Sequence, residues 1–168
     1  MSFNYSTALW PHSDDAFFRD LDISPKLQYG PHCVAACLSM LTGEPQRSYI
    51  DVVNTQDPLA WSDELKNHGK KLAYCPADVR RLEFYMPELV DYDDLFLLCY
   101  YTPTDPHRIL EDPDEHGWVC GSHVVILHRD RIYDPAKGEA VKADIHRCTT
   151  KHTKRVFRIV PADHERGI

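Results

Sequence analysis

The chain has 168 residues, a length that fits one domain and permits a well-buried core. Its formal net charge of -7 argues against general nucleic-acid binding, which needs a positive face for phosphate contacts. Residues 1–18 contain two aspartates and no apolar stretch long enough for a signal peptide or membrane span. We therefore expect a single domain over residues 1–168 without a nucleic-acid or membrane partner. We expect it in the cytoplasm, although secretion by a leaderless route would leave no mark in the sequence.

The N-terminal half is predicted to be helical. Residues 1–27 look irregular, with aromatic anchors at Trp10, Phe17 and Phe18. A helix is predicted over 33–41, where apolar residues recur at three- and four-residue spacing, and Gly43 is its natural end. Further helices are predicted over 46–54, 61–68 and 77–84, the second of these with Ser62 as N-cap and Gly69 as its end.

The C-terminal half changes to short strands. Continuous apolar runs predict strands over 95–101 and 122–128, and Arg129-Asp130 is a turn into 131–133, which makes a hairpin. The segment 102–117 is rich in Pro, Asp and His and predicts a surface loop, and 156–160 is a last strand. The basic run 147–158 is interpreted as a solvated strand flank. The expected fold class is α+β, with an N-terminal helical lobe packed on an antiparallel sheet.

The six cysteines are expected to be reduced thiols. Cys37 and Cys99 lie inside apolar runs, where a small thiol packs like any other core side chain. One thiol is therefore free to be a nucleophile. The six are Cys33, Cys37, Cys75, Cys99, Cys120 and Cys148.

Cys33 has the position that a reactive thiol requires. The Gly30-Pro31 turn delivers it to the first turn of the predicted helix over 33–41. The unpaired amides and the positive dipole end of a first helical turn stabilise a thiolate. A core thiol at a helix start is the structural alternative.

A cysteine nucleophile also needs a base, a group that orients the base, and donors for the oxyanion. His123 begins one strand of the predicted hairpin and Asp134 follows the other, which brings imidazole and carboxylate to one end of the sheet. Gln28, five residues before Cys33, is a candidate oxyanion donor, with the Cys33 amide as the second. Each also has a structural alternative: a sheet-capping histidine, an Asp-Pro turn and a loop glutamine.

The order of these residues resembles the papain-like cysteine peptidases, and most closely the bacteriocin-processing, double-glycine type. The similarity lies in the run from Cys33 to Gly43, in His123-Val124-Val125-Ile126-Leu127 and in Tyr133-Asp134-Pro135. It implies a papain-like fold with Cys33 as nucleophile, His123 as general base, Asp134 as orienting residue and Gln28 as oxyanion donor. The family usually places Gln six residues before Cys, whereas the gap here is five.

The resemblance implies a thiol hydrolase that cleaves amide or isopeptide bonds in a peptide or protein, without a cofactor or metal. Deamidases, transglutaminases and other acyl transferases use the same set of residues, and a non-catalytic binding or adaptor protein could keep the fold. A metal site formed by His32, His116, Cys120 and His123 is a weaker alternative, because their spacing matches no closed zinc pattern. The sequence leaves the oligomeric state open.

Overall fold

The computed structural model describes residues 8–110, 114–117 and 121–168, and these form a mixed α+β fold. The helices of this part are α1 (Cys33–Thr42), α2 (Pro58–Lys66) and α3 (Leu82–Asp91). Its strands are β1 (Lys70–Cys75), β2 (Leu95–Tyr101), β3 (Ser122–His128), β4 (Arg131–Asp134), β5 (Glu139–Lys142) and β6 (Thr153–Pro161). They form one 6-stranded sheet in the order β1-β6-β2-β3-β4-β5, and every neighbouring pair is antiparallel.

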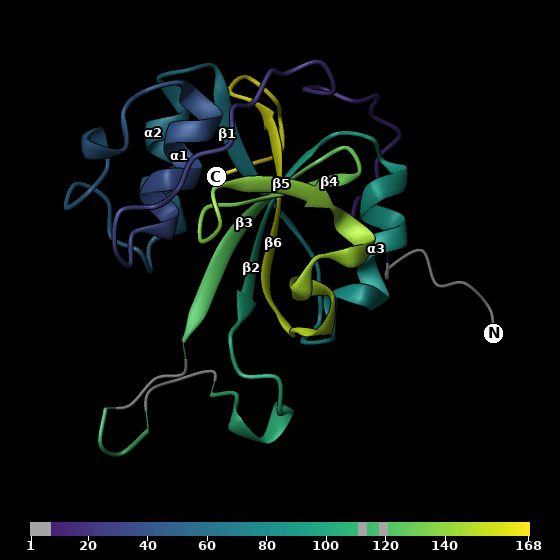
Figure 1. The fold of residues 1–168 in the computed structure, drawn as a ribbon. Coiled ribbons are helices and arrows are strands. Elements are labelled where there is room, and N and C mark those ends of the chain that lie inside the picture. The colour runs from purple at the N-terminus through teal and green to yellow at the C-terminus, as the bar shows by residue number, and fades with distance from the viewer. Residues whose placement is uncertain (1–7, 111–113, 118–120) are drawn as a thin grey trace.

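Both faces of this sheet are apolar and both are covered. Along β2 the side chains alternate, so that Leu95 and Leu97 belong to one core cluster and Phe96 and Leu98 to the other. Helices α1 and α2 cover the Leu95 face and α3 covers the Phe96 face, as the two sides of Figure 1 show. The predicted single helical lobe is therefore wrong in part, because the third helix lies on the opposite face.

The prediction of a helix over 33–41 is confirmed. The helix begins at Cys33 and ends where Gly43 takes a left-handed conformation (φ 83°), from which its N–H bonds the Ser39 carbonyl. It packs against β3, with Val34, Cys37 and Leu38 buried in the cluster on that face. The nucleophile candidate is therefore carried by a helix anchored along its length.

Other predicted elements are shifted or shorter. Only a 3-10 turn, Gln46–Ser48, forms in 46–54, because Asp51 has a left-handed backbone (φ 61°) that a helix cannot contain. Helix α2 begins at Pro58 with Asp57 as N-cap, so Ser62 lies inside it. The Ser62 hydroxyl instead accepts the Leu72 amide and donates to the Ile168 carbonyl.

The hairpin and the loop before it are confirmed in the described residues. Strands β3 and β4 pair in the register Ile126 with Tyr133 and His128 with Arg131. Residues 102–110 and 114–117 are mostly exposed, while 111–113 lie outside the described residues. In Figure 1 this segment extends beyond the end of the sheet at which β3 begins.

The basic run 147–158 is not a solvated flank throughout. Arg158 is 1% exposed and forms an ion pair with the fully buried Asp94, with 2.7 Å between Arg158 Nη2 and Asp94 Oδ2. Asp94 also accepts the backbone amides of Phe17 and Phe18, so this pair holds the N-terminal segment against the sheet. The anchoring role expected of the N-terminal aromatic residues is confirmed, since Trp10 is buried and Phe17 packs against the same cluster.

Among the described residues, no helix combines the length and the apolar character needed to cross a bilayer. The longest of their helices, α1 and α3, have 10 residues each, and a span needs about 20.

Candidate active site

Cys33 is the first residue of α1 and its side chain is partly exposed. No side chain of the described residues caps this helix, and its first turn contains no acidic residue. The first backbone bond of the helix runs from the Ala36 amide to the His32 carbonyl, so the amides of residues 33–35 have no partner within the helix. Negative charge at the Cys33 sulfur or on a bound oxygen is stabilised at this end of α1.

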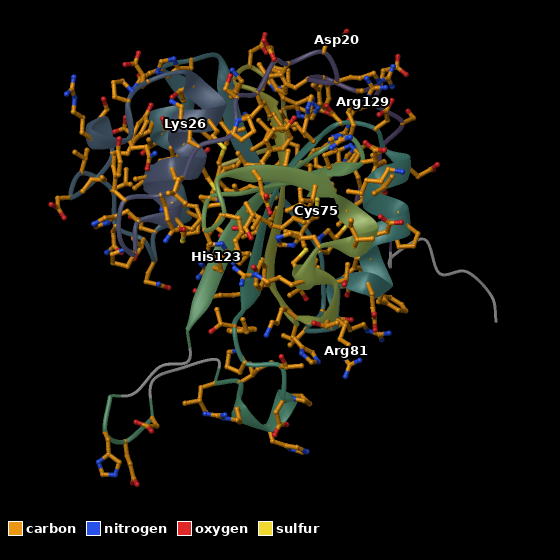
Figure 2. The ribbon with its side chains drawn as sticks, viewed as in Figure 1. Asp20, Lys26, Cys75, Arg81, His123 and Arg129 are labelled. Atoms are coloured by element: carbon orange, nitrogen blue, oxygen red, sulfur yellow. The ribbon has the colours of Figure 1, made fainter. Side chains whose placement is uncertain are left out.

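His123 and Asp134 meet as the hairpin prediction requires. His123 is the second residue of β3 and Asp134 is the last of β4, and the distance from His123 Nε2 to Asp134 Oδ1 is 2.8 Å. Both side chains are buried, His123 at 9% exposure and Asp134 at 2%. A carboxylate only accepts hydrogen bonds, so His123 Nε2 carries the proton and Nδ1 is the nitrogen left for Cys33. Figure 2 shows His123 beside β3.

The charge state of His123 reflects both neighbours. Burial lowers the pKa of His123, but hydrogen bonds with Asp134 and with Cys33 outweigh it and raise the pKa to about 9. Burial likewise raises the pKa of Asp134, but hydrogen bonds from His123, His146 and the Ala136 amide hold it well below its usual range. At neutral pH the pair is therefore imidazolium and carboxylate, with the Cys33 sulfur beside the ring.

A second histidine, which sequence reasoning missed, contacts the same carboxylate. His146 Nε2 lies 2.8 Å from Asp134 Oδ2, and His146 Nδ1 accepts the Cys148 amide at 3.0 Å. His146 is the N-cap of a 3-10 turn, Arg147–Thr150, that folds back toward the end of β4. No spacing in the sequence indicates this contact, because it depends on how the segment after β5 returns to the sheet.

Gln28 is held next to the site through its backbone. Its backbone amide donates a hydrogen bond to the carbonyl of Pro135 at 2.8 Å, and Pro135 is the residue that follows Asp134. Its side-chain Nε2 donates to the Gly30 carbonyl at 2.6 Å, and its Oε1 is buried with no hydrogen-bond partner among the described residues. One hydrogen of the Gln28 amide group remains for another acceptor.

Cys33 differs from the other described cysteines in exposure. The other four described cysteines are all buried: Cys37, Cys75, Cys99 and Cys148. Neither these four nor Cys33 is in a disulfide, and Cys120 lies outside the described residues. Burial raises the pKa of Cys37 well above its ordinary value and the pKa of Cys75, Cys99 and Cys148 to about 12. At neutral pH these four are protonated core thiols, so Cys33 is the accessible thiol of this set.

The alternative metal site depends in part on Cys120, which lies outside the described residues. Among residues 8–110, 114–117 and 121–168, no group of three or more His, Cys, Asp or Glu side chains is arranged to hold a metal ion. His116 pairs with the exposed Glu115 in the loop, at 3.4 Å.

No protein-family model matches the sequence, and no curated protein matches it significantly.

Proposed function

We propose that this protein is a cysteine-dependent acyl-transfer enzyme of papain-like fold, a thiol hydrolase acting through Cys33, His123 and Asp134. The observation that carries the proposal is the convergence of three distant segments at one end of the sheet. The start of α1 brings the thiol, β3 the imidazole and β4 the carboxylate. The residues are of the types, and in the contacts, that nucleophilic catalysis by cysteine needs.

In the proposed cycle the Cys33 proton resides on His123 and the sulfur attacks a carbonyl carbon of the substrate. A carbon–sulfur bond forms while the carbonyl π electrons move to oxygen. When the oxyanion collapses, the carbon–nitrogen bond breaks and His123 gives its proton to the leaving amine. Water, deprotonated by His123, then cleaves the thioester and regenerates the thiol. Asp134 keeps the His123 Nε2 proton in place throughout.

Two donors are assigned to the oxyanion. The Cys33 amide at the start of α1 is one, because it has no partner within the helix. The Gln28 side-chain amide is the second, supported by its backbone bond to Pro135 beside Asp134. Removal of one such donor typically slows turnover about 100-fold or more.

The acceptor of the acyl group distinguishes the members of this reaction class. Water gives peptide or isopeptide hydrolysis or deamidation, and an amine gives a transglutaminase-type product. A peptide or protein substrate fits all of them. A non-catalytic binding protein with the same fold is the second candidate, and it is distinguished by an inert Cys33.

Incubation with p-nitrophenyl acetate tests the proposal. We expect wild-type protein to acquire one acetyl group on Cys33, detected by intact mass and peptide mapping, and Cys37 and Cys75 to stay free because they are buried and protonated. Cys33→Ala should remain unlabelled. An added primary amine that appears in the released product would identify a transferase, and its absence from the product a hydrolase.

Cys75→Ala is the matched control, since it removes a described thiol in the apolar cluster opposite α1. It should label as wild type does. Equal labelling of the wild type and Cys33→Ala would contradict the proposal and favour a binding protein. So would a wild-type protein that neither carries a label on Cys33 nor releases p-nitrophenol faster than Cys33→Ala does.

A further inference from the structure

We propose that His146 is a positioning residue of this site, a neutral imidazole that fixes the Asp134 carboxylate in the orientation that His123 requires. The inference deepens the proposed function and rests on it. It assigns a role to a buried histidine that the Cys33, His123 and Asp134 set does not include.

The contacts of His146 determine its tautomer. The Cys148 backbone amide can only donate, so Nδ1, which receives it at 3.0 Å, is the unprotonated nitrogen. Nε2 therefore carries the hydrogen and donates it to Asp134 Oδ2 at 2.8 Å. The ring is thus neutral, and it offers Asp134 a hydrogen bond without adding a positive charge that would compete with His123.

The ring is also held firmly. His146 is 7% exposed, and its carbonyl accepts both the amide and the hydroxyl of Thr149, at 3.2 and 3.0 Å. These bonds close the turn, and both nitrogens of the imidazole are hydrogen-bonded. A buried hydrogen-bond donor on a closed turn can hold the carboxylate in one orientation.

The two oxygens of Asp134 are used separately. Oδ1 accepts hydrogen bonds from His123 and from the Ala136 amide, at 2.8 and 2.9 Å, whereas Oδ2 accepts a hydrogen bond from His146. The terminal torsion of an aspartate is otherwise soft, and rotation about it would turn Oδ1 away from His123. Without His146, the Oδ2 side of the carboxylate would lose its buried donor.

Other groups near Asp134 cannot replace that donor. Arg147 Nη2 lies 3.6 Å from Oδ2, but its side chain is 52% exposed and screened by water. Tyr100, Cys37 and Cys148 also lie near Asp134, and the pKa of each is raised first by burial and to a lesser extent by the Asp134 charge. Besides His123, His146 is the buried side chain among these described neighbours that is hydrogen-bonded to Asp134.

Two isosteric replacements separate the positioning role from a purely structural one. In His146→Gln the amide nitrogen takes the place of Nε2 and keeps the bond to Asp134. In His146→Asn the amide oxygen takes the place of Nδ1 and keeps the Cys148 contact, but the side chain is too short to reach Asp134.

Two readouts are measured on each variant: the pKa of His123 by NMR titration and the rate of Cys33 alkylation by iodoacetamide at pH 7. We expect His146→Asn to lower the pKa of His123 from about 9 toward its ordinary value and to slow alkylation about tenfold or more. His146→Gln should remain close to wild type in both. In an Asp134→Ala background, His146→Asn should change neither quantity further, because its effect passes through Asp134.

The opposite ranking, with Asn near wild type and Gln impaired, would overturn the inference and assign His146 to the turn alone. An undiminished effect of His146→Asn in the Asp134→Ala background would overturn it too. His128→Gln is the control, because His128 is equally buried but contacts the Phe18 carbonyl at the other end of β3. If wild-type Cys33 is no more reactive than a free thiol while His146→Asn still shifts the His123 titration, the proposed function fails and the positioning role stands.

Discussion

Replacing His123 with alanine should slow the alkylation of Cys33 by iodoacetamide about 30-fold at pH 7. An unassisted cysteine, with a pKa of about 8.5, is only about 3% thiolate at that pH. In the structure the His123 ring contacts both Cys33 and Asp134, and the proposed function requires its positive charge to hold the sulfur as a thiolate. Removing the ring removes that charge. The loss in turnover of a substrate should be larger, about 100-fold to 10,000-fold, since His123 also protonates the leaving group.

His128→Ala is the comparison for this variant. It removes a second buried histidine from the same strand, at the end away from Cys33. Its alkylation rate should match wild type as long as the protein is folded, which circular dichroism monitors. An unchanged rate in His123→Ala would show that the imidazole does not ionise Cys33.

Replacing Arg158 with alanine should lower the free energy of unfolding by about 3–5 kcal/mol, the usual effect of leaving one buried charge without its partner. Two bonds from the guanidinium, of 3.1 and 2.7 Å, end on Asp94 Oδ2. The same group lies 4.9 Å from the ring centroid of Trp10 and 4.8 Å from that of Phe17. The variant leaves the Asp94 charge buried and loosens the N-terminal segment. For a chain of this length the midpoint of thermal unfolding should fall about 10 °C.

Arg129→Ala is its control, because Arg129 pairs with Asp93 at 2.8 Å on the surface, where water screens the interaction. Urea denaturation should give it a midpoint close to wild type. A similarly small change for Arg158→Ala would mean that the Asp94 pair does not hold the N-terminal segment in place.

Local sequence patterns were sufficient for the elements that carry the candidate triad. Strands β2 and β3 are continuous apolar runs buried on both faces, and the structure has them at the predicted bounds, Leu95–Tyr101 and Ser122–His128. The start of α1 was fixed by the Gly-Pro turn before Cys33 and its end by Gly43. A short hairpin constrains its own register, so the meeting of His123 and Asp134 followed from the sequence.

Elements that depend on distant pairing were not predictable in this way. Strand β1 begins with two lysines at the edge of the sheet, and its partner β6 lies more than 75 residues further along the chain. Strand β5 has only four residues. Helix α3 continues to Asp91 through Pro87, a residue that normally ends a helix, so the prediction over 77–84 placed it too early.

The same physical reason explains why His146 was missed. Its contact with Asp134 requires that the segment after β5 turn back through two 3-10 turns, and neither turn has an apolar periodicity. The burial of Arg158 was missed because a basic run predicts exposed side chains. A basic side chain is buried only where a buried acidic residue pairs with it. Asp94, 64 residues away, is that acid.

The pH dependence of Cys33 alkylation, followed from pH 4 to pH 10 in the wild type, is the most direct test of the central claim, which is that His123 keeps this sulfur ionised. The pKa of His123 is raised to about 9, so the imidazolium is present below that pH and is lost above it. We predict a rate that is already high well below pH 7, with a second change near pH 9 that is absent from His123→Ala. A single rise centred near pH 8.5, as for a free cysteine, would contradict the account.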